Sequence, residues 1–196
     1  MTSFYPMLIA SYLVGAIPTG VLLTRLFGST DIRNSGSGNI GATNVYRVAG
    51  KKLGILTLVG DALKGAVPVL IAMTLLGFGD AQVGAVAAAA FIGHCYPVYL
   101  GFKGGKGVAT ALGIFLVLSP LAVLGAFIIF ALLLWKWRYV SLGSISAAAA
   151  IPLLVYLTGG SLSLITTTLF ISLVVILRHH QNIQRLLNGS ENRFKA

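Results

Sequence analysis

The sequence predicts an all-α integral membrane protein with several transmembrane helices. Of its 196 residues, 57% are apolar and only 9% are charged, whereas a soluble domain averages about 25% charged residues. The mean hydropathy is +0.92, and apolar runs follow one another along the whole chain. We therefore expect one transmembrane domain over residues 1–196, without a separate soluble domain.

Seven apolar runs are candidate membrane-spanning helices. A span takes about 20 residues, or fewer where protein shields a broken helix from lipid. The runs cover residues 4–27, 53–77, 81–100, 108–118, 121–135, 140–157 and 162–177. The first basic residue is Arg25, so the first run lacks the charged start of a secretion signal and is expected to remain as a helix.

The basic residues between these runs predict which loops face the cytoplasm, because Lys and Arg accumulate on that side. The loop at residues 31–52 carries four of them, so we expect it inside the cell and the N-terminus outside. If residues 108–135 were one crossing, the later basic segments would lie outside. A short helix that ends near Ser119 and Pro120 places those segments inside. We therefore predict seven crossings and a cytoplasmic C-terminus.

The formal net charge of +10 fits a membrane surface better than nucleic acid, because the basic residues flank apolar runs. We expect no nucleic-acid partner and no obligatory protein partner. The single cysteine, Cys95, excludes an internal disulfide, and no cluster of His, Cys and carboxylate residues suggests a metal or a cofactor. With only four acidic residues, a mechanism based on paired carboxylates is not expected.

On the predicted topology, four polar stretches share the cytoplasmic face. They cover residues 34–47, 101–110, 141–144 and 178–186. The first contains Gly36, Gly38 and Gly41 in the spacing of a dinucleotide fingerprint, but no strand precedes it, so we reject that interpretation. A solvated connector is the alternative. The length of the loop and its Gly, Ser and Asn content favour a loop that binds a polar ligand.

The second stretch holds two lysines and four glycines. Glycine lets the backbone approach a ligand closely, while lysine and the start of a helix supply positive charge. This combination predicts a phosphate cradle, although the spacing is not that of a nucleotide P-loop. A membrane-surface anchor would explain either lysine alone, but not the glycines.

The third and fourth stretches have simpler alternatives. Ser141 and Ser144 open an apolar run, where a serine is usually a helix cap. On a helix His179 and Asn182 share one face, and the alternative is a basic helix that lies at the membrane surface.

Isolated charged residues elsewhere are harder to interpret from sequence. Asp61 and Lys64 interrupt the second run three residues apart. They could pair across one helical turn, either as a structural ion pair or as functional groups. His94 is either a packed histidine or a site residue. We interpret Asp31 and Glu191 as isolated surface charges.

Together these stretches resemble the acyl-phosphate:glycerol-3-phosphate acyltransferase family (PlsY type) of bacterial membranes. The matching positions are residues 36–39 with Arg47, then Gly93, His94, Pro97 and residues 102–110, and finally residues 141–144 with Arg178, His179, Asn182, Ile183, Arg185 and Leu186. The resemblance implies transfer of a long-chain acyl group from acyl phosphate to the 1-hydroxyl of sn-glycerol 3-phosphate, forming lysophosphatidic acid and inorganic phosphate. It also implies a bacterial cytoplasmic (inner) membrane, with the active site facing the cytoplasm. The other type of glycerol-phosphate acyltransferase uses a His-x4-Asp dyad, and here the residue five after His94 is Tyr99.

Two phosphorylated substrates require cationic and N–H donors. We expect catalytic roles for Ser37, Arg47, Lys106, His179 and Asn182, and substrate binding by Gly38, Asn39, Thr43, Asn44, Gly104, Gly105, Gly107 and Ser144. Arg47 can bind a phosphate through two parallel hydrogen bonds, and Lys106 with the N–H groups of residues 104–107 suits another. The proton of the glycerol hydroxyl passes either to His179 or to a substrate phosphate, and we favour the phosphate.

A transporter for a phosphorylated anion is the alternative function, because broken helices with N-termini directed at an anion also occur in transporters. The polar stretches, however, share one membrane face, and the two halves of the sequence show no inverted repeat. A purely structural membrane subunit is a third possibility.

Overall fold

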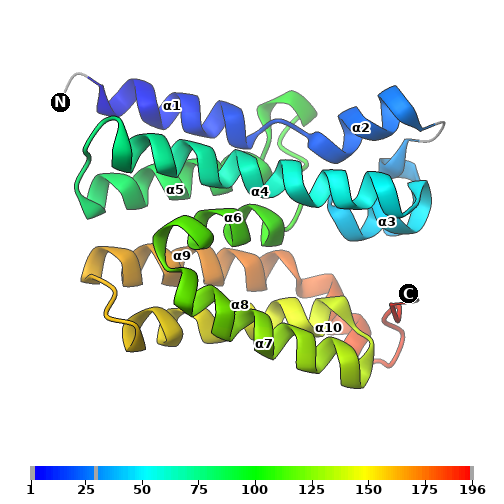
Figure 1. Ribbon diagram of the computed structural model, residues 1–196. Helices are drawn as coiled ribbons and strands as arrows, with labels where there is room; N and C mark the ends of the chain where they lie inside the picture. The colour runs from blue at the N-terminus through cyan, green and yellow to red at the C-terminus, as the bar shows by residue number, and fades with distance from the viewer. Residues whose placement is uncertain (1–2, 29–30, 195–196) are drawn as a thin grey trace. The chain divides into compact units, whose positions relative to one another are not determined.

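The computed structural model describes residues 3–28 and 31–194, and this part of the chain consists of helices and loops without β-strands (Figure 1). The helical prediction is thereby confirmed. The chain divides into two compact units, one up to Val117 and one from Leu118 onward.

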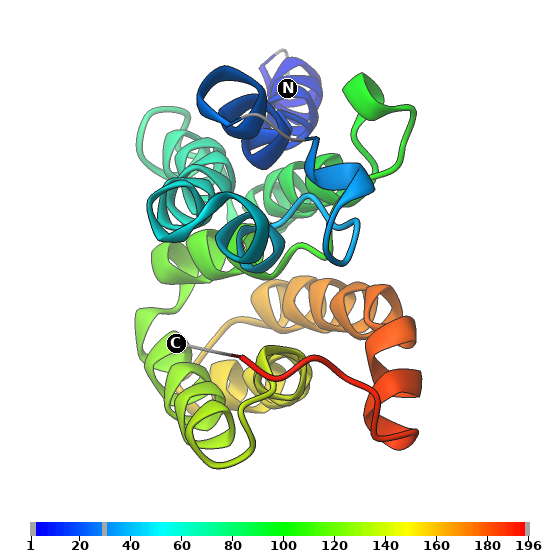
Figure 2. The same ribbon diagram turned by 90° about the vertical axis from the view of Figure 1, so that its right-hand side faces the viewer.

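The first unit contains eight helical elements among its described residues. They are α1 (Phe4–Gly15), α2 (Thr19–Phe27), η1 (Ile32–Asn34), α3 (Ala42–Ala49), α4 (Lys51–Thr74), α5 (Asp80–Cys95), η2 (Val98–Leu100) and α6 (Val108–Leu118). Helices α1, α4 and α5 pack against one another, and they group together when viewed along their axes (Figure 2).

Small residues bring the backbones of these helices into contact. A Cβ atom at Gly15 of α1 would overlap the backbone of Ala90 on α5, and one at Gly93 would meet the carbonyl oxygen of Tyr12. In the same way Gly113 of α6 lies against the backbone of Ala62 on α4. Close packing through small residues is the usual way to join helices in a bilayer, where apolar burial gives little net gain.

The first apolar run forms two helices instead of the single one that we expected. α1 ends at Gly15, Pro18 precedes α2, and the two helices are bent by 42°. Proline cannot donate the backbone hydrogen bond that continues a helix. Pro68, in contrast, lies inside the continuous α4.

The second unit contains four helices among its described residues. They are α7 (Pro120–Trp137), α8 (Val140–Leu157), α9 (Leu162–Arg178) and α10 (His180–Leu187). α8 packs against both α7 and α9, and Arg138 provides the left-handed turn between α7 and α8 with φ of 64°. The hydroxyl of Ser161 accepts the N–H of Leu164 and caps α9.

Two helix boundaries in this region lie at Pro120 and at His179. α6 ends at Leu118 and α7 begins with Pro120 in its first turn, so the break predicted at Ser119 and Pro120 is confirmed. The basic stretch after residue 177 is not one helix, because α9 and α10 meet at His179 with a bend of 55°.

Four of the described helices are long and apolar enough to cross a membrane, namely α4, α5 with η2, α7 and α8. The number rises to six if each bent pair, α1 with α2 and α9 with α10, is one span. α6 is a shorter apolar helix of 11 residues.

Candidate functional site

One amide side chain shapes the loop before α3. Asn44 is 2% exposed, and its Nδ2 group lies 2.9–3.1 Å from the carbonyl oxygens of Ile32, Ser35 and Asn39. Its Oδ1 atom accepts the backbone N–H of Ser37 at 2.8 Å. Asn44 therefore builds the loop, and the contact with a substrate that we expected of it stays a prediction.

The other predicted residues of this loop surround Asn44. Ser37 and Gly38 are exposed, whereas Asn39 is half-buried and accepts the N–H of Gly41 at 2.9 Å at the start of α3. Thr43 is half-buried in the first turn of α3, and Arg47 is exposed in its last turn. Beneath them lies an apolar cluster of Val21, Ile32, Ile40 and Val45.

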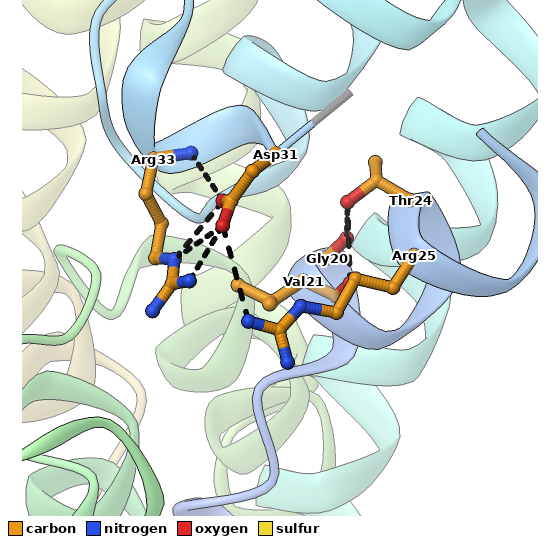
Figure 3. A network of polar contacts seen from close by, with 6 residues as sticks. All are labelled: Gly20, Val21, Thr24, Arg25, Asp31 and Arg33. Carbon is orange, nitrogen blue, oxygen red and sulfur yellow. Dashed lines mark hydrogen bonds and ion pairs between the residues drawn. The ribbon is translucent and has the colours of Figure 1, made fainter. Parts of the chain in front are cut away.

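Asp31 is not the isolated surface charge that we expected. Its carboxylate accepts the backbone N–H of Arg33 at 3.0 Å and hydrogen bonds from the guanidinium group of the same residue, and Arg25 approaches it to 3.9 Å (Figure 3). The hydrogen bonds from Arg33 hold the pKa of Asp31 well below its usual range. Arg33 thus pairs with a carboxylate of the protein, although it is exposed like Arg47.

The lysine–glycine loop at residues 101–107 packs onto the end of α5. Cβ atoms at Gly104 and Gly105 would overlap the carbonyl oxygen and the ring of His94, and one at Gly107 would overlap the ring of Phe91. Gly107 also has φ of 80°, a conformation that favours glycine. The glycines are therefore required by packing within the protein, a reason that the sequence did not reveal.

One N–H group of this loop is already used. The backbone N–H of Gly105 donates to the carbonyl oxygen of His94 at 3.2 Å, and the phosphate cradle that we expected from residues 104–107 stays a prediction. Lys106 is half-buried, while Lys103 is exposed. Within the first unit, Leu100 packs against the apolar cluster under the Asn44 loop, which connects the two polar loops of this unit.

The expected ion pair in α4 is present. Lys64 Nζ lies 2.8 Å from Asp61 Oδ1, and both side chains are almost completely buried. His94 is also buried, with its Nδ1 atom 3.7 Å from the same carboxylate oxygen.

Glu191 is the organising residue of the second unit, although we interpreted it as an isolated surface charge. Its carboxylate accepts hydrogen bonds from Ser141 at 2.9 Å, Asn182 at 2.8 Å and Arg185 at 2.7 Å. Burial alone would raise the pKa of Glu191, but the hydrogen bonds from Arg185, Asn182 and Ser141 outweigh it and lower the pKa. The only sequence signal was an acidic residue that follows a strongly basic stretch.

His179 occupies the bend between α9 and α10 and is buried. Its Nδ1 atom lies 2.7 Å from the carbonyl oxygen of Val175. A carbonyl can only accept a hydrogen bond, so Nδ1 carries a proton, and in the neutral ring Nε2 is the basic nitrogen. Asn182 lies in the first turn of α10, and Ser144 donates to the carbonyl oxygen of Val140 within α8 at 2.9 Å.

Among the described residues, 3–28 and 31–194, there is no group of three or more His, Cys, Asp or Glu side chains that could hold a metal ion. The structure thus presents two polar loops in the first unit, joined through Leu100, and a hydrogen-bonded polar group around Glu191 in the second.

Comparison with known proteins gives consistent matches over nearly the whole chain. The model of the family described as glycerol-3-phosphate acyltransferase matches residues 5–189. A glycerol-3-phosphate acyltransferase of Syntrophotalea carbinolica is 84% identical over 196 residues, which cover 100% of both chains.

Two solved structures are also similar. Both are crystal structures of PlsY (YgiH), an integral membrane glycerol 3-phosphate acyltransferase. The glycerol 3-phosphate form has a TM-score of 0.93 and 44% identity, and the lysophosphatidic acid form has a TM-score of 0.91 and 42% identity. Each match covers 98% of this chain and 96% of the other.

Proposed function

The chain belongs to the glycerol-3-phosphate acyltransferase family, and from this premise we propose that it transfers a fatty acyl group from acyl phosphate to the 1-hydroxyl of sn-glycerol 3-phosphate. The products are lysophosphatidic acid and inorganic phosphate. The observation that carries the proposal is that the family match includes all four polar stretches. The ligands named for the two PlsY structures are the acceptor and the product of this reaction.

The proposed reaction is an acyl substitution. The glycerol oxygen attacks the carbonyl carbon of the acyl phosphate, a new C–O bond forms, and the bond from that carbon to the phosphate oxygen breaks. The phosphate leaves with the electron pair of the broken bond. Because acyl phosphate is already activated, the protein needs only to align the substrates and stabilise charge, and alignment alone can contribute up to about 7–11 kcal/mol.

Arg47 and Lys106 are the proposed phosphate ligands. Arg47 is exposed at the end of α3 and suits paired hydrogen bonds to a phosphate, while Lys106 supplies a point charge. Ser37, Gly38, Asn39 and Thr43 line the first loop, and Ser144, His179 and Asn182 of the second unit are proposed to serve the same reaction. The proton of the glycerol hydroxyl passes to a substrate phosphate or to Nε2 of His179, and we favour the phosphate.

We also propose the membrane arrangement. The N-terminus lies outside, the C-terminus and the polar loops face the cytoplasm, and the short α6 is the fourth of seven crossings of one transmembrane domain in the inner membrane. The positions of the basic residues support this topology.

The proposal is tested with purified protein in detergent. Phosphate release from acyl phosphate should depend on glycerol 3-phosphate, and lysophosphatidic acid should appear in equal amount by mass spectrometry. Release without the acceptor would contradict the proposal. Flux of glycerol 3-phosphate into vesicles without chemistry would instead support the transporter.

The chain offers matched controls for the two cations. Arg47→Ala and Lys106→Ala should each lower kcat/KM by about a hundredfold or more, since removing one such donor costs about 10²–10³-fold. Arg33→Ala and Lys103→Ala, which remove a neighbouring cation from the same loops, should have little effect. Most activity remaining in Arg47→Ala or Lys106→Ala would remove that residue from the site. Near-normal turnover of His179→Gln would exclude His179 as the base.

A further inference from the structure

The strongest unexplained feature of the molecule is a row of buried charged and polar groups in the first unit. Asp61, Lys64 and His94 are 2%, 6% and 3% exposed. Charges inside a membrane domain are costly, and apolar side chains of similar size would often pack at least as well. The proposed reaction uses none of the three residues, so their presence in the core needs another reason.

The row begins at the break between α1 and α2. Lys64 Nζ donates to the carbonyl oxygen of Ile17 at 2.7 Å and pairs with Asp61 Oδ1 at 2.8 Å. Ile17 directly precedes Pro18, where the helical hydrogen bonding of α1 has ended. Lys64 thus links the Asp61 carboxylate of α4 to the backbone at the break between α1 and α2.

The row ends at the lysine–glycine loop. Asp61 Oδ1 lies 3.7 Å from His94 Nδ1. On the other edge of the ring, Nε2 fills the space that a side chain at Gly105 would need, and the backbone of His94 accepts the N–H of Gly105. His94 therefore stands between the buried carboxylate and the residue immediately before Lys106.

We propose that His94, held in place by Asp61 and Lys64, is a positioning residue that sets the place of the Gly105 backbone and thereby of Lys106. A second contact fixes the end of α5 two residues after His94, because the hydroxyl of Tyr12 on α1 donates to the carbonyl oxygen of Tyr96 at 2.8 Å. The functional part of this inference rests on the proposed role of Lys106 in phosphate binding. The positional part can be tested without activity.

The activity test measures two variants in detergent. One is His94→Asn, and the other is a double variant that carries both Asp61→Asn and Lys64→Met. Asparagine keeps a polar group near the position of Nδ1 but removes the ring edge that faces Gly105. We expect kcat/KM to fall about tenfold to a hundredfold, because a misplacement of about 1 Å can cost about a hundredfold, with a rise in KM for a phosphorylated substrate. The control is Thr57→Val, since Thr57 is equally buried on α4 and its hydroxyl donates to the carbonyl oxygen of Leu53 within its own helix.

The positional test measures the labelling rate of a thiol introduced by Lys106→Cys, with and without His94→Asn. Cys95 is buried and sets the background rate in the parent. We expect His94→Asn to change the labelling rate at position 106 by about threefold or more, because a local opening of the loop changes access to the thiol. The labelling rate of Lys103→Cys should stay unchanged.

The outcomes separate the two proposals. A changed labelling rate at position 106 with retained activity in Lys106→Ala would keep the positioning role and reject Lys106 as a phosphate ligand. Equal labelling rates with and without His94→Asn would overturn the positioning role. So would a loss of activity that only follows a lowered melting temperature and also occurs in Thr57→Val.

Discussion

The Asn44 loop of the first unit and the Glu191 group of the second unit are each built around one buried side chain, but with different chemistry. Asn44 is a neutral amide that bonds to backbone groups within a short stretch of sequence. Glu191 is a carboxylate that bonds to side chains from α8 and α10. The amide fixes the path of the chain, whereas the carboxylate fixes the orientation of side chains from two helices. The stability that Asn44 contributes should not change with pH, whereas the stability that Glu191 contributes should.

The largest expected effect comes from Asn44→Ala. It leaves the N–H of Ser37 and carbonyl groups of the loop without their partner, and each such group that stays buried costs about 1–3 kcal/mol. Because water reaches part of the loop, we expect a total loss of about 3 kcal/mol in stability, together with loss of activity. Thermal unfolding in detergent measures the loss of stability, and Asn34→Ala, at an exposed position, is the control. A loss below about 1 kcal/mol would show that the amide does not hold the loop.

A smaller, pH-dependent effect is expected from Glu191→Gln. The pKa of Glu191 is lowered in the folded protein from its ordinary 4.5. The charged carboxylate therefore stabilises the folded state above about pH 4.5, and this contribution is lost as the pH falls through the lower pKa of the folded protein. The melting temperature of Glu191→Gln should be lower than that of the parent at pH 7, and the two should converge in acid.

Over the same pH range the lower melting temperature of Asn44→Ala should persist, because an amide does not titrate. Asp80→Asn, which alters an exposed acid in the first turn of α5, controls for net charge. A constant difference between Glu191→Gln and the parent across the range would refute the assignment of this stability to the ionised carboxylate.

The smallest effect is expected from Asp31→Asn, which removes a charge from the same loop that Asn44 builds. Asparagine still caps a helix start, and the lost ion pairs with Arg33 and Arg25 are partly exposed. Exposed ion pairs contribute little and are screened by salt. We expect a change in melting temperature near the limit of measurement that disappears at high salt. A deficit as large as that of Glu191→Gln would mean that charge also holds the first unit together.

The sequence allowed the prediction of features that depend on neighbouring residues. The helical class follows from the apolar runs, the break at Ser119 and Pro120 from proline, and the Asp61–Lys64 pair from a spacing of three residues. The capping role of Asp31 is equally local, since its partner Arg33 lies only two positions away. It was nevertheless missed.

Other features depend on contacts that no local pattern reveals. Glu191 meets Ser141 across 50 positions of sequence, so its role depends on how the chain folds back. Pro18 interrupts a helix while Pro68 does not, and the carbonyl oxygen of Ile17 beside the break is bonded by Lys64 from another helix. The need for glycine at positions 104 and 105 likewise comes from His94 on α5.

The backbone contact between α1 and α5 also constrains biogenesis. During synthesis α1 leaves the ribosome first, and α4 follows before α5 exists. Gly15 and Gly93 can meet only after α5 has been synthesised, so Asp61 and Lys64 are made before the histidine that completes their surroundings. We therefore expect variants at Gly15 or Gly93, which would disturb this contact, to fail at assembly in the cell before they fail at catalysis.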